Sequence, residues 1–514
     1  MDMLSSSEER MLIDKYSPFM GRTHITTSCL PSDMQFPSYK GDTLDETTIA
    51  RELARAVSLH RDSMNQFRAL RAIYKGNQTI LDRVQTDDMR SNNKIVMNYA
   101  QAFTRDIVGY TYSSGTSYSA RAPDKTDEVQ ELDGILQEQF ITAVRKAAAD
   151  DQSIGGHGYV EVLSQDGGDS PLQIVHLQPD NTEVVYSEYN PNLRVFAWNS
   201  YEATIDNKKV TLYNVYTNKR IYTVSSTGSQ FSDPLPFVLN NGVTQTVLPF
   251  QPNPMGAIPI IEYRNNQFNI GDWECAISLF EALNNVASDS VNDVENVVKS
   301  ILCIFGVDPD TINIDKSKKG GFMLAFPGTV GLQQDAKFIS QPLDGSSVDL
   351  LRSYLSEAMM FITGIPSRDT GVSGSDTGVS AQARTGANDI ETVAANKVMF
   401  TKMAERQLLR TVLSVLHSKG RLTNLVSSDV DIEIPRSKLN GVQSRVQSMV
   451  QLYGIGVDPV DVAKLGDLTT DLTGFVKRWQ DNLSKQTAVQ PAQTPDTTAE
   501  APVNSTTEDT ANVQ

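Results

Sequence analysis

The glycine-rich stretch Gly155-Gly156-His157-Gly158 is the part of the sequence closest to a phosphate-binding loop. Such a loop cradles phosphates with backbone N–H groups, and it needs a Lys-Ser/Thr pair followed by a helix. Here the pair is missing, and the residues that follow the stretch predict a strand. We therefore interpret it as a turn that leads into a strand.

The histidines and cysteines form no catalytic or metal-binding pattern. The five histidines never fall at the spacing of metal ligands, and the three cysteines include no ligand pair. We interpret the cysteines as small core residues, and their odd, sparse count is typical of a reducing compartment. The residues concerned are His24, His60, His157, His176 and His417, and Cys29, Cys275 and Cys303.

The acidic residues and nucleophiles add no reaction centre. No Gly-x-Ser-x-Gly elbow occurs, and paired acids such as Asp150-Asp151 lie at predicted helix ends, where solvated charge is the expected role. The sequence therefore predicts no enzyme, no cofactor and no metal site. An enzyme with a β-rich substrate domain is disfavoured, because no catalytic constellation is present.

Length and charge limit the classes of protein further. A chain of 514 residues has room for two to four domains, and its net charge of −17 argues against a protein that coats nucleic acid by neutralising phosphates. If the protein handles nucleic acid, the nucleic acid would have to move past it without being bound tightly. No apolar run of 18 residues occurs, and Met1–Arg10 lacks the apolar core of a signal peptide, so we predict neither a secreted nor a membrane-spanning chain.

One long run without proline predicts the helix around which the chain is organised. From 380 to 419 apolar residues recur at three- and four-residue steps, and Gly386 offers a place for a bend. Because heptads are absent, the helix is expected to span two regions rather than to form a coiled coil. Its apolar positions are Ile390, Val393, Ala394, Met399, Met403, Leu409, Val412, Leu413 and Leu416.

The remaining segments predict a mixture of helices and strands. Apolar residues at helical spacing predict helices over 45–73, 93–109, 127–151, 272–299 and 348–362, and shorter helices within 441–485. Strands are predicted over 110–121, in a β-rich block that ends at 263, within 300–344 and over 429–434. Residues 1–44 and the acidic residues 486–514 lack any period, and we expect an extended arm and a disordered tail.

Two polar segments stand out between the predicted helices. The loop from 368 to 378 combines glycines with short hydroxyl side chains, and its composition alone favours a surface linker. Its polar residues are Arg368, Asp369, Thr370, Ser373, Ser375, Asp376 and Thr377. The lysines Lys316, Lys318 and Lys319 form a basic cluster, which by itself indicates a solvated turn. If several copies of the chain formed a ring, the cluster would make a ring of positive charge near its opening.

Six stretches in order along residues 70–420 carry a family resemblance. They are Tyr74-Lys-Gly-Asn-Gln-Thr-Ile80, Asn93-Lys-Ile-Val-Met-Asn-Tyr99 with Val108-Gly-Tyr110, Gly158-Tyr-Val-Glu-Val162, Ile258-Pro-Ile-Ile-Glu-Tyr-Arg-Asn-Asn266, Gly271-Asp272 with Asp289–Glu295, and Gly364-Ile-Pro366 to Ser380 before the long helix. Each is weakly specific alone. Together they resemble the portal proteins of tailed bacteriophages, in the branch typical of siphophages that infect Gram-positive bacteria.

The resemblance implies a ring, usually of twelve subunits, at one vertex of the virion capsid. Double-stranded DNA passes through such a ring during packaging and again during ejection through the tail, and the ring itself hydrolyses nothing. The implied partners are the terminase large subunit, the major capsid protein, the scaffold protein and a head-tail adaptor, with assembly in the host cytoplasm and no membrane. An acidic scaffold or adaptor protein without a channel is the alternative.

The resemblance also implies a domain map for an α+β, portal-type ring subunit. Its parts are an N-terminal arm (1–44), a β-rich wing (45–271), a two-helix stem (272–299 and 348–363), a small α/β clip (300–347), a tunnel loop (364–379), a long kinked wing helix with a wing strand (380–436), a helical crown (437–485) and a tail (486–514). The polar residues of the loop would then line the channel, and the three lysines would lie in the clip.

Overall fold

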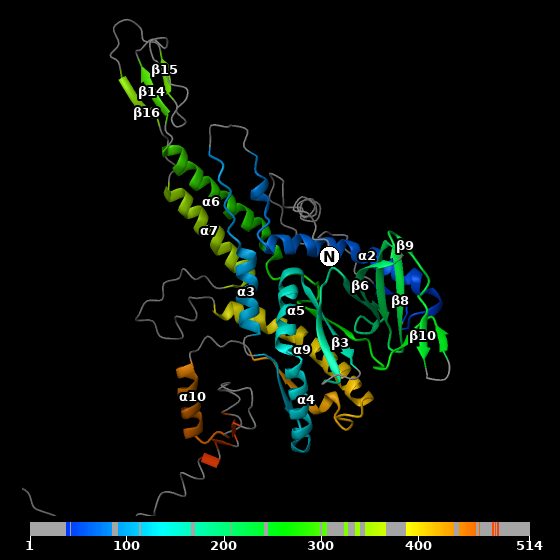
Figure 1. The fold of residues 1–514 in the computed structure, drawn as a ribbon. Coiled ribbons are helices and arrows are strands. Elements are labelled where there is room, and N and C mark those ends of the chain that lie inside the picture. Colours follow the sequence, from blue (N-terminus) through cyan, green and yellow to red (C-terminus); the bar gives the residue numbers. More distant parts are fainter. Residues whose placement is uncertain are drawn as a thin grey trace, which may run out of the picture. The chain divides into compact units, whose positions relative to one another are not determined.

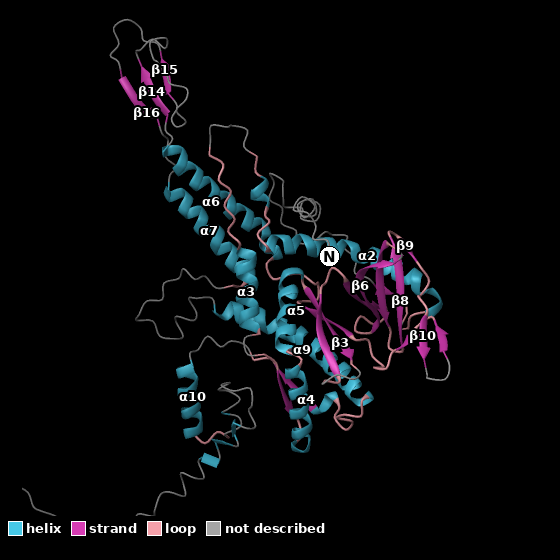
Figure 2. Cartoon of the chain, in the orientation of Figure 1, coloured by secondary structure: helices cyan, strands magenta, loops and turns pink. Residues whose placement is uncertain are grey.

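The computed structural model divides into two units, Met1–Leu439 and Asn440–Gln514, and each is described by itself. The first unit combines helices with several sheets, which confirms the predicted α+β class (Figures 1 and 2). The residues that the structure describes are 38–41, 43–84, 91–112, 115–165, 170–205, 207–240, 245–298, 301–305, 323–326, 335–339, 345–365, 387–435, 442–458, 462, 475–476, 478–479 and 481–482.

Helix α2 (Ile49–Tyr74) confirms the first predicted helix. Its apolar residues recur on one face, and Gly76, at φ +89°, follows its end in the left-handed conformation that glycine adopts readily. The two ends of the buried face enter different core clusters, because Leu53 packs beside the larger sheet and Phe67 beside helix α6 (Ile277–Val298). The helix therefore connects two parts of the core.

The helix predicted over 93–109 is wrong in its first part. Helix α3 begins only at Tyr99 (Tyr99–Thr111), and residues 91–98 have no regular secondary structure. Three backbone N–H groups in this stretch donate to side chains of helix α6: Asn93 to Asn292 Oδ1 (2.6 Å), Ile95 to Ser288 Oγ (2.9 Å) and Met97 to Asn284 Oδ1 (2.8 Å).

The spacing of these three bonds explains why the stretch is extended. Two residues of an extended chain span about 6.6 Å, and four residues of a helix rise about 6 Å, so every second N–H meets a side chain four residues earlier in α6. The three acceptor residues are buried: Asn284 is 1% exposed, Ser288 0% and Asn292 5%. Buried polar groups need partners, so the extended stretch and helix α6 satisfy one another.

Two other predicted boundaries also differ. Because α3 continues to Thr111, the strand predicted over 110–121 is reduced to β2 (Ser117–Ala120). The single helix predicted over 127–151 is two helices, α4 (Thr126–Glu138) and α5 (Ile141–Gly155). Phe140 separates them at φ +51°, a left-handed conformation that a helix cannot continue through.

The glycine-rich stretch at the end of α5 is a strand-entry turn, as predicted. Helix α5 ends at Gly155, Gly156 adopts φ +84°, and strand β3 begins at His157. A Cβ on Gly156 would lie 2.0 Å from the carbonyl oxygen of Asn269, so the backbones approach more closely than any other residue would permit.

The β-rich block forms two main sheets (Figure 2). The smaller has the order β13-β3-β4, and helices α5 and α9 (Ala387–Ser418) pack with it in one core cluster. The larger has the order β1-β5-β6-β7-β8-β12, with β9 also paired to β8. The strands are β1 (Ser38–Tyr39), β3 (His157–Ser164), β4 (Leu172–Leu177), β5 (Thr182–Ser187), β6 (Arg194–Ile205), β7 (Lys208–Tyr216), β8 (Arg220–Thr227), β9 (Gln230–Phe231), β12 (Gln251–Pro252) and β13 (Ile260–Arg264), and β10 (Phe237–Asn240) pairs with β11 (Gln245–Leu248).

Helix α9 confirms the predicted long helix over the residues described. Its 32 residues span about 48 Å, and its buried side enters two clusters. Ile390 and Ala394 pack with α3, whereas residues from Ala404 to Leu416 pack with α4 and the smaller sheet. After the helix, β17 (Val430–Glu433) pairs antiparallel with β2.

Two helices flank the predicted insert of short strands. Helices α6 and α7 (Gly345–Thr363) lie side by side (Figure 1), and three strands lie between them in sequence. These strands form one sheet of order β15-β14-β16, from β14 (Ile301–Phe305), β15 (Met323–Phe326) and β16 (Asp335–Ile339). In the second unit, α10 (Val442–Gly454) falls within the segment predicted to be helical.

Candidate functional site

The site residues predicted from the sequence lie outside the described residues. This holds for the loop residues Arg368 to Thr377, for Lys316, Lys318 and Lys319, and for Gly386. The structure does describe the elements that precede and follow them. Helices α6 and α7 flank the predicted insert, and helices α7 and α9 flank the predicted loop.

The described residues on the two sides of the predicted loop are in contact. Gly364, at φ +67°, donates its N–H to the carbonyl of Met360 (2.8 Å) and ends helix α7. A Cβ at this glycine would lie 2.7 Å from Cγ2 of Val393 on α9, so the end of α7 and the first turns of α9 are in direct contact. Ile365 is buried in the cluster that contains Phe280. The last described residues of the α7 end and the first turns of α9 therefore pack together.

A buried ion pair joins α9 to the segment that precedes α6. Lys397 Nζ lies 2.7 Å from Asp272 Oδ2, and both side chains are almost fully buried, at 2% and 6% exposure. Asp272 also accepts a hydrogen bond from Asn265 Nδ2 (2.8 Å), and its backbone N–H donates to Ser153 (2.9 Å). The pair was missed from sequence, although a lysine three residues after Ala394 falls on the buried side of the helix.

Glu274 is a second buried acidic residue, two positions after Asp272. It is 4% exposed, accepts the N–H of Gly271 at one oxygen (3.1 Å) and the side-chain amide of Gln66 at the other. Burial raises the pKa of Glu274 to about 7, against hydrogen bonds that favour the charged form. Near neutral pH this carboxyl therefore carries a proton in a large fraction of folded molecules.

Replacing Glu274 with glutamine should change how stability depends on pH. The carboxyl has a higher pKa folded than unfolded, so its contribution is fully present below about pH 4.5 and is lost as the pH rises to about 7, at about 1.4 kcal/mol per pH unit. We expect Glu274→Gln to be more stable than the native chain at pH 8 and no more stable at pH 4.5. Urea unfolding at both pH values measures this, and a gain that is equal at both would contradict it.

A second buried network fixes the middle of α9. Arg145 of α5 donates to both oxygens of Glu405, from Nε (2.7 Å) and Nη2 (2.8 Å). The hydroxyls of Tyr118 and Tyr263 also donate to Glu405, at 2.9 Å and 3.0 Å. Burial alone would lower the pKa of Arg145, but attraction to Glu405 outweighs it and raises that pKa above its ordinary value. One carboxylate thus binds groups from three elements.

Two predictions about single residues are wrong. Asp151 is not a solvated helix-end charge, because it is 8% exposed and hydrogen-bonded to His176 Nε2 (2.7 Å), and burial raises its pKa. Cys275 is exposed rather than a core residue. His60 is buried with Glu183 at 2.6 Å, so His60 and His176 belong to two separate structural pairs.

One face of helix α7 exposes large apolar side chains. Leu350, Tyr354 and Phe361 are 74%, 67% and 87% exposed, and at 100° per residue they lie within about 40° of one another around the helix. We call these three residues the α7 stripe. The opposite side of the helix buries Met359 against the core. Extended exposed apolar surface of this kind marks a site of association.

Two other kinds of feature, a metal-binding cluster and a membrane-spanning helix, are not found among the described residues. Within them, no group of three or more His, Cys, Asp or Glu side chains is arranged to hold a metal ion. A search of the same residues finds no helix with the length and apolar character needed to span a membrane. The site therefore consists of two buried ion pairs, which join α9 to α5 and to the segment before α6, and of the exposed α7 stripe.

Comparison with known proteins identifies the family. No curated protein matches the chain. Among solved structures, it is similar to the neck of an empty GTA particle (12% identity, 71% of this chain and 89% of that chain, TM-score 0.38) and to the virion of a native gene transfer agent particle (10% identity, 72% and 88%, TM-score 0.38). The family model for the SPP1 Gp6-like phage portal protein matches residues 59–454. The chain therefore belongs to the SPP1 Gp6-like family of phage portal proteins.

Proposed function

We propose that this protein forms a ring at one vertex of a phage capsid and serves as the channel for DNA during packaging and ejection. Membership of the portal family supports the role, and the α7 stripe is the observation that supports the ring. A single chain leaves this stripe in water, whereas repeated copies around a closed ring would cover it by a heterologous contact. We propose twelve subunits, as is usual in the family.

The proposed partners follow from that role. The terminase large subunit would drive double-stranded DNA through the ring, the major capsid and scaffold proteins would surround it, and a head-tail adaptor would bind its outer end. Helices α6 and α7 would form the stem, and the strands between them the clip. The ring would carry out no catalysis and would assemble in the host cytoplasm before it becomes part of the virion.

Assembly is the property that tests the ring. We expect the purified chain to sediment as a particle many times 56.6 kDa and to show top views with a central hole in electron microscopy. Leu350→Asp and Phe361→Asp should reduce ring formation by about tenfold or more, because a charge would be buried at the contact. Both side chains are exposed in the subunit, so its thermal unfolding should hardly change. Compact monomers at micromolar concentration would contradict the ring, and a closed particle without a hole would favour the scaffold or adaptor alternative.

The residues proposed to line the channel are Arg368, Asp369, Thr370, Ser373, Ser375, Asp376 and Thr377. Translocation requires weak contact that is independent of DNA sequence, and a clamp of lysines would release each phosphate slowly. Replacing Asp369 and Asp376 with lysine should therefore leave rings intact and impair packaging of DNA. Normal packaging by this double variant would reject the assignment.

A further inference from the structure

The two faces of the smaller sheet bury different kinds of side chain. Side chains alternate between the faces along each strand, and residues directly opposite in an antiparallel pair share a face. On one face, Val160, Ile261 and Tyr263 pack in the core cluster that contains residues of α9. The other face, which packs on the larger sheet, buries four titratable side chains, none more than 6% exposed: His157, Tyr159, Glu161 and Glu262.

These side chains meet helix α2 and strand β5 of the larger sheet. Glu183 of β5 lies 2.6 Å from Nδ1 of His60 on α2, and its other oxygen accepts a hydrogen bond from the hydroxyl of Tyr159 at 3.1 Å. One carboxylate therefore joins α2, the larger sheet and the smaller sheet. We call this contact the sheet joint, and its polar residues are His60, His157, Tyr159, Glu161, Glu183, Tyr186, Glu262 and Arg264.

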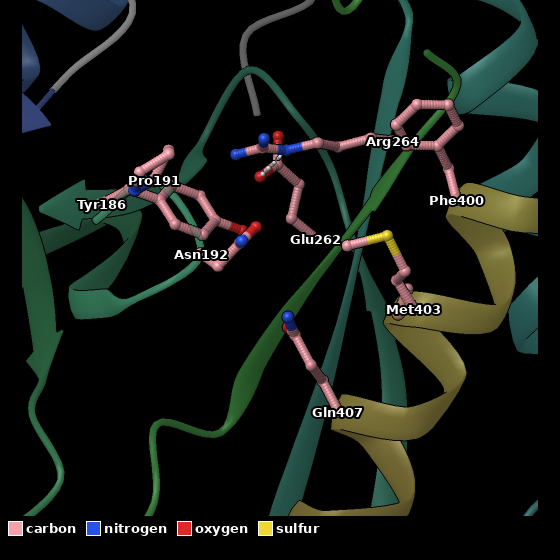
Figure 3. Close-up of a pocket in the computed structure, with 9 residues that line it drawn as sticks. Tyr186, Pro191, Asn192, Glu262, Arg264, Phe400, Met403 and Gln407 are labelled. Atoms are coloured by element: carbon pink, nitrogen blue, oxygen red, sulfur yellow. Dashed lines mark hydrogen bonds and ion pairs between the residues drawn. The ribbon is translucent and has the colours of Figure 1, made fainter. Parts of the chain in front are cut away.

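Solvent reaches the rim of the sheet joint beside α9. Tyr186, Glu262 and Arg264 line a pocket there of about 40 Å³, which has room for about three water molecules (Figure 3). Arg264 donates to Glu262 (2.9 Å) and stacks over the Tyr186 ring at 4.3 Å, and its side chain is 33% exposed. His157 lies directly opposite Arg264 in the ladder of β3 and β13 but is itself buried.

His157 is tightly packed and lacks hydrogen-bond partners. Neither of its buried ring nitrogens has a partner among the described residues. Its ring packs against those of Phe67 on α2 (6.2 Å between centroids) and Tyr159 (5.5 Å). A Cβ on Gly155 would lie 2.2 Å from Cδ2 of Phe67, so the backbone of α5 holds the Phe67 ring in place. A positive charge on His157 would therefore be buried among aromatic rings.

The charges around His157 do not compensate for its burial. Three carboxylates attract a charged His157, and each already has its own partner: Glu183 with His60, Glu262 with Arg264, and Asp151 of α5 with His176. Arg71 of α2 adds positive charge on the side of Phe67, with its guanidinium 5.1 Å from the centre of that ring. Burial lowers the pKa of His157, and attraction to these carboxylates does not offset it. The closed joint therefore holds His157 neutral.

We infer that His157 makes the sheet joint sensitive to acid, because binding of a proton by this residue favours separation of the two sheets. In the open joint the ring meets water and has its ordinary pKa of about 6.5. The closed joint lowers that pKa, so the equilibrium shifts toward the open joint as the pH falls below about 6.5, and the shift is absent well above it. Each sheet keeps an apolar core of its own, the larger with Leu53 of α2 and the smaller with α9.

Two matched reporters distinguish opening of the joint from unfolding of the subunit. Ile260 and Ile261 are consecutive residues of β13, both fully buried, the first on the joint face and the second on the α9 face. In full-length Ile260→Cys, a disulfide reagent such as dithiodipyridine reaches the new thiol only when the joint opens. Ile261→Cys reports the opposite face in the same way. Peptide mass spectrometry separates each new thiol from the native cysteines.

His157→Gln removes the proton-binding group from each reporter chain. Glu161 acts in the opposite sense, because burial raises its pKa and its protonation favours the closed joint. The effect of Glu161 and the reactivity of the reagent cancel in the ratio of labelling rates, that of Ile260→Cys over Ile260→Cys/His157→Gln. We expect this ratio to rise by up to about tenfold from about pH 7.5 to about pH 5.5. His157→Phe, which keeps a ring beside Phe67, provides the same comparison if the glutamine variant does not fold.

Tyr159→Phe is the control for a joint that is weaker but still contains His157. It removes the hydroxyl that binds Glu183, so labelling of Ile260→Cys should be faster by the same factor at both pH values. A factor that changes with pH as much as with His157→Gln would mean that any change in the joint has this effect, and would overturn the inference.

The two reporters decide the outcome. A ratio that rises in acid for Ile260→Cys and stays constant for Ile261→Cys supports the inference. A ratio for Ile260→Cys that is the same at both pH values would show that His157 is not the sensitive group. An equal rise for Ile261→Cys would show that the whole subunit unfolds, and either of these two results overturns the inference.

Discussion

Glu405→Leu is expected to lower the free energy of unfolding by about 3–5 kcal/mol. Arg145 is 4% exposed at its side chain, and the substitution would leave its guanidinium buried without the carboxylate that it binds through two nitrogens. The hydroxyls of Tyr118 and Tyr263 would lose the same acceptor. A buried charge without a partner is among the most destabilising defects in a protein.

The matched control removes both charges. In Arg145→Met/Glu405→Leu no ion remains to be buried, so most of the lost stability should return. Urea unfolding of each purified variant, followed by circular dichroism, measures the difference. A single variant within about 1 kcal/mol of the native chain would mean that water reaches Arg145, and a double variant as unstable as the single would mean that packing rather than charge is responsible.

Leu283→Asp is expected to prevent the subunit from folding, with a loss of about 4 kcal/mol or more. Leu283 of α6 is 1% exposed and packs in the cluster that contains Trp273, Phe280 and Met359. The substitution removes a buried leucine and places a carboxylate among apolar side chains at the base of the proposed stem. The amount of soluble, folded protein and its thermal unfolding measure the effect.

Val291→Asp separates folding from assembly on the same helix. Val291 is 42% exposed, so this substitution should change the stability of the subunit by less than about 0.5 kcal/mol. If α6 belongs to the stem, it should nevertheless reduce ring formation, because the charge would lie at a seam between subunits. Normal rings from both variants would show that α6 and α7 are not the stem.

Local periodicity explains the parts of the fold that could be predicted from sequence. Helices α2, α6, α7 and α9 each repeat apolar residues at helical steps. Most strands of the β-rich block are short segments of strand-forming residues that lie between turn residues. These patterns record which side of an element is buried, whatever it packs against. The resemblance to portal proteins depended in the same way on short stretches in order, and the family match over residues 59–454 confirms it.

Two of the errors arise from contacts between distant segments. Residues 93–98 carry apolar side chains at helical spacing, yet their N–H groups bind side chains of α6 almost two hundred positions later. Asp151 was taken for a solvated charge because its partner, His176, lies on a strand outside its helix. The break at Phe140 was not predicted, because no glycine or proline lies beside it in the sequence.

Hydrophobic periodicity and short motifs are properties of neighbouring residues, so the class of fold, the order of the elements and the family could be predicted without the structure. The structure was needed to show which charges are buried together, as with Lys397 and Asp272, and which apolar side chains remain exposed, as with Phe140 and Phe361. Burial depends on what another part of the chain brings to the same place. A lysine or a phenylalanine in a helix has the same local pattern whether it is covered or exposed, so its energetic role appears only when the elements are packed.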